Sequence, residues 1–144
     1  MTTGRLAFTT FVAFIVSQVL AVAVHGFILA GDYGPYYGSL LRNMDGPAWQ
    51  ALFLPVAHLA FISALVWVYT RAGLEGSPAA QGLKLGFLGW LMGQAPLWLI
   101  WYAEQPWPGA LLVKQLGLEL VSSLIIGMTI AAVARRPQPS TALG

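Results

Sequence analysis

The sequence contains no cysteine and few charged residues. The absence of cysteine excludes disulfides, thiolate metal sites, iron–sulfur clusters and thiol catalysis. Only 8% of the 144 residues are charged, whereas a soluble domain carries about 25%. The few Lys and Arg residues are scattered and form no basic stripe, so nucleic acid is not an expected partner. With 58% hydrophobic residues, the chain cannot cover a water-exposed surface, which predicts an integral membrane protein.

Long apolar segments alternate with short polar ones and predict an all-α fold. The expected transmembrane helices span residues 6–30, 49–70, 82–103 and 108–134. They form one domain, 1–136, a four-transmembrane-helix bundle of two antiparallel hairpins, followed by a disordered cytoplasmic tail over 137–144. The first apolar run continues past a possible signal-peptide cleavage site at Ala23, so we expect a retained span. Pro96 should kink the outer third of the third helix.

Basic and aromatic residues divide between the two predicted sides of the membrane. The side with both termini and the 71–81 turn holds Arg5, Arg71, Lys84, Arg135 and Arg136. The other side holds only Arg42 and Lys114. Positive charge marks the cytoplasmic side, so the N- and C-termini are predicted to be cytoplasmic. Most Trp and Tyr residues lie on the opposite face, either as a belt at the headgroups or as a docking surface for a membrane partner or a flat cofactor.

Several polar side chains lie within the predicted spans, where a carboxylate costs roughly 2–3 kcal/mol even on mild insertion scales. This intramembrane polar set comprises Gln18, His25, His58, Gln94, Lys114 and Glu119. At ~1.5 Å of rise per residue, His58, Gln94 and Glu119 fall near the bilayer midplane. His25 lies nearer the outer surface, level with Lys114, which can snorkel outward. We expect His58 to pair with Glu119, either as a shared proton site or as a hydrogen bond that fixes helix register.

Small residues predict where the helices approach one another most closely. The third span carries glycines at spacings of four, three and four, which share one helical face: Gly82, Gly86, Gly89 and Gly93. On the fourth span Ser123 and Gly127 continue an i, i+4, i+8 series from Glu119, so Glu119 belongs to the side that faces neighbouring helices. Both sets predict helix-packing seams.

No catalytic or metal-binding motif is evident. The sequence has no Ser-His-Asp arrangement, phosphate loop or HExxH helix, so no catalytic residue and no metal site are predicted. No cofactor is expected either, although a haem between His25 and His58 stays open. On antiparallel neighbours the two imidazoles would differ in depth by ~4–5 Å. A metal held by His58 and Glu119 would need His25 as a third ligand.

Three segments resemble a known group of proteins: HGFILAGDY (25–33), AQGLKLG (80–86) and WYAEQPWPGALLVKQ (101–115). They look like segments of small bacterial four-span integral membrane proteins of no assigned activity. The resemblance covers most of the chain. It implies a four-span architecture in a bacterial inner membrane, and it supplies no catalytic residue.

Three functions fit these observations. The glycine face and the aromatic rim favour a non-enzymatic packing or accessory module that associates with itself or with a larger membrane complex. The alternative is a proton-coupled carrier or channel for a small solute, with Glu119 and His58 as the proton site. A haem- or quinone-linked redox subunit is the third hypothesis.

Overall fold

The structure, a computed structural model, describes residues 1–42 and 47–134. The helices are α1 (Thr3–Ala21), a π-helix (Val22–Ile28), α2 (Ala30–Tyr33), α3 (Phe53–Arg71), α4 (Pro78–Met92), α5 (Gln94–Glu104) and α6 (Gly109–Val133). Short 3₁₀ turns over Gly34–Tyr36 and Ala48–Leu52 frame the loop before α3. The all-α prediction is confirmed. The predicted tail over 137–144 lies outside the described residues.

Four helical segments of the described chain are long and apolar enough to cross a membrane, as a polytopic membrane protein requires. They are Thr3–Ile28, Trp49–Arg71, Pro78–Glu104 and Gly109–Val133. These bounds differ from the predicted spans by only a few residues at each end. The first and third segments begin three to four residues earlier than predicted, because Thr2 and Ser77 each cap a helix N-terminus with the side-chain oxygen.

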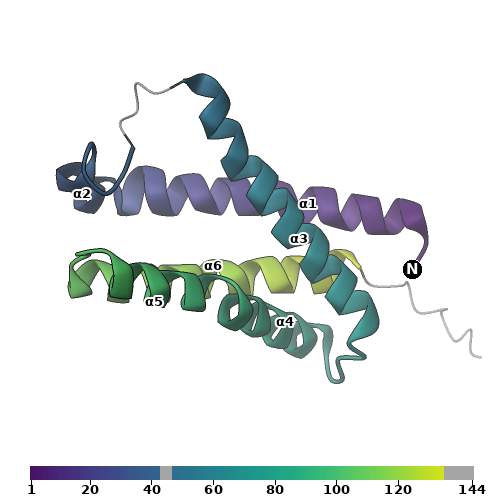
Figure 1. Cartoon of the computed structure of the whole chain (residues 1–144). Helices are drawn as coiled ribbons and strands as arrows, with labels where there is room; N and C mark the ends of the chain where they lie inside the picture. Colours follow the sequence, from purple (N-terminus) through teal and green to yellow (C-terminus); the bar gives the residue numbers. More distant parts are fainter. Residues whose placement is uncertain (43–46, 135–144) are drawn as a thin grey trace, which may run out of the picture.

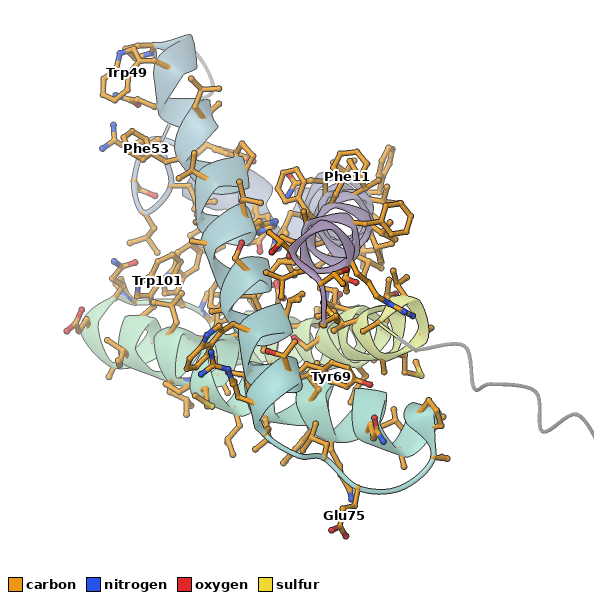
Figure 2. All side chains as sticks on the ribbon, turned by 90° about the vertical axis from the view of Figure 1, so that its right-hand side faces the viewer. Phe11, Trp49, Phe53, Tyr69, Glu75 and Trp101 are labelled. Atoms are coloured by element: carbon orange, nitrogen blue, oxygen red, sulfur yellow. The ribbon has the colours of Figure 1, made fainter. Side chains whose placement is uncertain are left out.

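The helices form two antiparallel pairs, α1 with α3 and α4–α5 with α6 (Figure 1). Helix α6 also packs along α1, and this contact joins the two pairs. Helix α3 crosses the others obliquely and contacts them through its C-terminal half, called the inner half below. Its N-terminal half, called the outer half, leaves the bundle, and Trp49 and Phe53 lie at the end that projects away from the other helices (Figure 2).

The seam between α4 and α6 is the most extensive contact in the fold. A Cβ atom added to Gly82 would lie 2.6 Å from the Cα atom of Met128, and one added to Gly127 would overlap the backbone of Gly82 and Gly86. The two backbones therefore touch, which only glycine permits. The indole Nε1 of Trp90 donates a hydrogen bond of 3.1 Å to the carbonyl oxygen of Leu116 at the outer end of this seam.

The predicted glycine face of the third span packs against two neighbouring helices, α6 and α3. A Cβ atom on Gly86 would meet the backbone of Ser123 on α6. Gly89 and Gly93 instead face α3, where an added Cβ would lie 2.9 Å from a side-chain carbon of Leu65 and of Phe61, respectively. The glycines thus fix α4 between α6 and the inner half of α3.

The third span is two helices rather than one kinked helix. Helix α4 ends at Met92, and α5 begins at Gln94, because the φ of −114° and ψ of −77° at Gly93 depart from regular α-helix values. Pro96 has no N–H group, and its ring clashes with the carbonyl of the residue four positions earlier, Met92. The break therefore precedes the proline. It places the side chain of Gln94 at the start of α5.

Two apolar clusters fill the bundle. The inner cluster, buried between α1, α3, α4 and α6, consists of Ala13, Ile62, Leu65, Val66, Leu85, Ile126 and Ile130. The outer cluster holds the loops against α6 and consists of Val24, Leu29, Tyr33, Trp107 and Leu111. Two residues of the predicted aromatic belt, Tyr33 and Trp107, are therefore internal. Ionisable side chains collect between the two clusters.

Candidate functional site

A hydrogen-bonded chain of Tyr33, His25 and Glu119 lies between the two apolar clusters. The Tyr33 hydroxyl lies 3.0 Å from Nδ1 of His25, and Nε2 of His25 lies 3.0 Å from Oε1 of Glu119. The rings of Tyr33 and His25 are stacked, with centroids 6.0 Å apart. With an ionised carboxylate and a neutral imidazole, Nε2 of His25 donates to Glu119 and Nδ1 accepts from Tyr33.

The predicted direct pair of His58 and Glu119 is wrong, because Glu119 bonds to His25. A regular helix would place His25 nearer the outer surface and on the same face as Gln18. The π-helix over Val22–Ile28 adds a residue to the turn. It therefore rotates His25 away from the face of Gln18 and toward α6. Residue counting assumed α-helical geometry and could not include this rotation.

His58 belongs to a second hydrogen-bonded group. Its Nδ1 lies 2.8 Å from Nε2 of Gln18, and that amide nitrogen lies 3.5 Å from Oγ of Ser17. Ser17 donates in turn to the carbonyl oxygen of Phe14 at 2.7 Å. His58 and Gln18 thus meet between α3 and α1.

The two groups face a cavity of about 40 Å³ to which all four spans contribute. Its polar lining is Ser17, His25, His58, Gln94, Glu119 and Ser122, and its apolar lining is Leu20, Ala21, Val24, Phe61, Ile62 and Ile126. Four residues of the intramembrane polar set therefore share this cavity, and Gln18 adjoins it through His58. The cavity can hold small polar molecules next to a carboxyl group.

Lys114 lies outside this cavity. Its Nζ is 2.8 Å from both carboxylate oxygens of Asp32, and the two side chains are 54% and 33% exposed. An ion pair this exposed contributes about 0–1 kcal/mol to stability. The pair ties α2 to α6 beside Tyr33, at the outer end of the hydrogen-bonded chain.

Sequence inspection missed three members of the site: Ser17, Tyr33 and Ser122. A usable signal exists for one of them. Tyr33 follows His25 by eight residues, about two helical turns, within the segment 25–33. The two serines carry no such signal, because serine is common in helices that pack closely in membranes.

Titration of Tyr33 tests the buried end of the chain. Burial, reinforced by the negative charge of Glu119, raises the pKa of Tyr33 above its usual value of 10.0. Above about pH 10, Tyr33 loses its hydroxyl proton in the unfolded chain but keeps it in the folded protein. The free energy of unfolding therefore falls as the pH rises. We expect Tyr33→Phe to lessen the fall in melting temperature above about pH 10. Tyr102→Phe, which changes an exposed tyrosine, should leave the fall intact; an identical fall in wild type and Tyr33→Phe contradicts the assignment.

The site does not fit a bis-histidine haem. Both ring nitrogens of His25 are engaged, one with Tyr33 and one with Glu119, so neither is available to an iron atom. Among the described residues, no group of three or more His, Asp or Glu side chains is arranged to hold a metal ion. The arrangement suits proton binding better than metal ligation.

Comparisons with known proteins supply no further assignment. No family model, curated protein or solved structure matches the chain. The resemblance to small bacterial four-span proteins stays a prediction, and the chemistry of the site carries the functional argument.

Proposed function

We propose that the protein is a proton-coupled carrier of a small solute, with Glu119 as the proton-binding group. The observation that carries this proposal is the Glu119 carboxyl group itself. It lies within a membrane span, is hydrogen-bonded to His25 and faces a polar cavity. Ionisable groups inside membrane spans are costly and commonly mark proton or substrate pathways.

The Tyr33–His25–Glu119 chain has the donor and acceptor order that proton uptake needs. The Tyr33 hydroxyl gives its proton to Nδ1 of His25, where a new N–H bond forms. The Tyr33 oxygen takes a replacement proton from hydronium at the outer end of the chain, so its O–H bond is restored. The N–H bond at Nε2 then breaks, and its proton passes to Oε1 of Glu119, which becomes a neutral carboxylic acid. Uptake removes a charge from the low-dielectric interior, and release restores it.

The inner apolar cluster favours a carrier over an open channel. Its buried members are all aliphatic, and two of them, Ile62 and Ile126, also line the cavity. A continuous proton path would have to open this layer. The break at Gly93, with Phe61 of α3 packed on it, supplies a hinge of the kind that helix breaks provide.

We also propose that the protein lies in a bacterial inner membrane with both termini in the cytoplasm. The resemblance supports the bacterial membrane. The charge distribution supports the orientation. Arg5 lies at the start of α1, Arg71 at the end of α3 and Lys84 in the first half of α4, and these helix ends lie on the side of the N-terminus (Figure 1). Lys114 lies near the start of α6, at the opposite end. The chain has no native cysteine, so labelling single cysteines placed at each end with an impermeant maleimide in intact cells tests the orientation.

Proton flux into liposomes tests the function. We expect vesicles that contain the protein to dissipate an imposed pH gradient, read with a trapped pH-sensitive dye, faster than protein-free vesicles. A panel of small solutes added with the gradient identifies the coupled solute by acceleration of the flux. If the loaded vesicles leak no faster than empty ones with any solute, the proposal is wrong.

A second candidate function is membrane packing, alone or in a complex. The outer half of α3 supports it, because residues 51–60 include no buried side chain and the helix departs from its neighbours there (Figure 2). Self-association through this half would give α3 the contacts that it lacks within the chain. Light scattering in mild detergent measures the oligomeric state, and a monomer that copurifies with no other protein contradicts this candidate.

A further inference from the structure

One buried acceptor in the cavity has no hydrogen-bond donor. The side-chain oxygen Oε1 of Gln94 is buried and accepts no hydrogen bond from any described residue. Buried polar atoms are satisfied in the great majority of cases, by protein groups or by ordered water. Gln94 opens α5 immediately after the break at Gly93, so its position is set by the backbone rather than by a polar partner.

Two further groups on the cavity wall have free hydrogen-bonding capacity. Glu119 uses Oε1 for His25, and Oε2 has no partner among the described residues. His58 uses Nδ1 for the amide nitrogen of Gln18. An amide nitrogen only donates, so Nδ1 accepts, and Nε2 of the neutral imidazole carries the hydrogen. The wall thus offers two acceptor oxygens and one donor N–H group.

The volume and the polar lining of the cavity favour water as the molecule that fills it. A volume of about 40 Å³ has room for about three water-sized spheres. A water molecule can donate to Gln94 and Glu119 and accept from His58. A metal cation would suit the two oxygens but would be repelled by the N–H group of His58.

We propose that this cavity is a hydration site in which water molecules bridge Gln94, Glu119 and His58, and that Glu119 releases its proton to this water. The inference rests on the proposed function. After uptake at Oε1, the neutral carboxyl group rotates about its Cγ–Cδ bond, so that the protonated oxygen faces the cavity. Release breaks this O–H bond, the carboxylate keeps the electron pair, and the adjacent water becomes hydronium. Gln94 Oε1 accepts a hydrogen bond from that hydronium and is a positioning residue. In the resting state one oxygen of Glu119 faces the chain from Tyr33, and the other is available to the cavity.

Two variants remove the water by different means. Gln94→Leu removes the acceptor at similar side-chain size, and Ala21→Leu fills the cavity from its apolar wall without changing any polar group. Ala7→Leu, at an exposed position of the same helix α1, is the matched control for the added bulk. Melting temperatures in detergent identify variants that are misfolded. If Ala21→Leu fails to fold, the proton flux of Gln94→Leu alone tests the hydration site.

Infrared spectroscopy and flux decide the outcome together. In the difference spectrum after a pH jump, we expect wild-type O–H stretching bands that shift in H₂¹⁸O and that are absent in Ala21→Leu. Proton flux should fall roughly tenfold or more in Gln94→Leu and Ala21→Leu, as expected when one hydrogen-bonded step is lost. Ala7→Leu should match wild type in both measurements.

Two results overturn the hydration site. One is a wild-type spectrum with no band that shifts in H₂¹⁸O. The other is wild-type flux in both cavity variants while Glu119→Gln stops the flux, in which case the proposed function stands without the water. If the Glu119→Gln variant conducts at the wild-type rate, the proposed function fails instead, and the infrared bands alone decide the hydration site.

Discussion

Replacement of Glu119 by glutamine is expected to abolish proton flux in liposomes. Glutamine has nearly the same shape, and its side-chain oxygen can still accept the hydrogen bond from Nε2 of His25. It cannot bind or release a proton at neutral pH. A positioned group that transfers a proton accelerates the transfer by about 10²–10⁴-fold, so we expect the rate to fall at least about a hundredfold, to that of protein-free vesicles.

The control for this variant is Glu75→Gln. Glu75 is an exposed carboxylate in the turn between α3 and α4, so this substitution makes the same chemical change outside the membrane spans. Its flux should equal that of wild type. Both variants should melt near the wild-type temperature, because neither removes a packed group. Full flux in Glu119→Gln would show that the carboxyl group plays no part in transport.

Gly127→Ala is expected to have the largest effect on stability. Its single added methyl group would overlap the backbone of Gly82 and Gly86, which cannot move as a side chain can. Overpacking a core by one methyl group typically costs 1–3 kcal/mol, and we expect a loss of about 3 kcal/mol here because the contact is with backbone. Thermal or SDS-induced unfolding, followed by tryptophan fluorescence, measures the loss.

Gly117→Ala is the matched control on the same helix. A Cβ atom on Gly117 would meet no heavy atom within 4 Å. Alanine is about 1 kcal/mol more favourable than glycine inside a helix, so this variant should be as stable as wild type or slightly more stable. Equal melting temperatures for the two alanine variants would contradict the close backbone contact between α4 and α6.

The sequence by itself determined the class, the spans and the packing glycines. Charge is too scarce to cover a water-exposed surface, and four apolar runs each reach the length of a bilayer. These are local properties of composition and length, so they do not depend on how the helices pack. The spacing of Gly82 and Gly86 likewise follows from the helical repeat alone. Three of the polar residues that share the cavity, His58, Gln94 and Glu119, could be placed at one level in the same way, by their depth along each helix.

Only the tertiary structure decided which polar groups pair. The π-helix rotates His25 toward Glu119, and the break at Gly93 sets Gln94 on the cavity wall. Both are departures from regular helix geometry, and a residue count that assumes 3.6 residues per turn carries them forward as errors. The spacing of eight residues brings Tyr33 near His25, but its burial beside Leu111 of α6 is a contact between residues distant in the sequence, which no local pattern encodes.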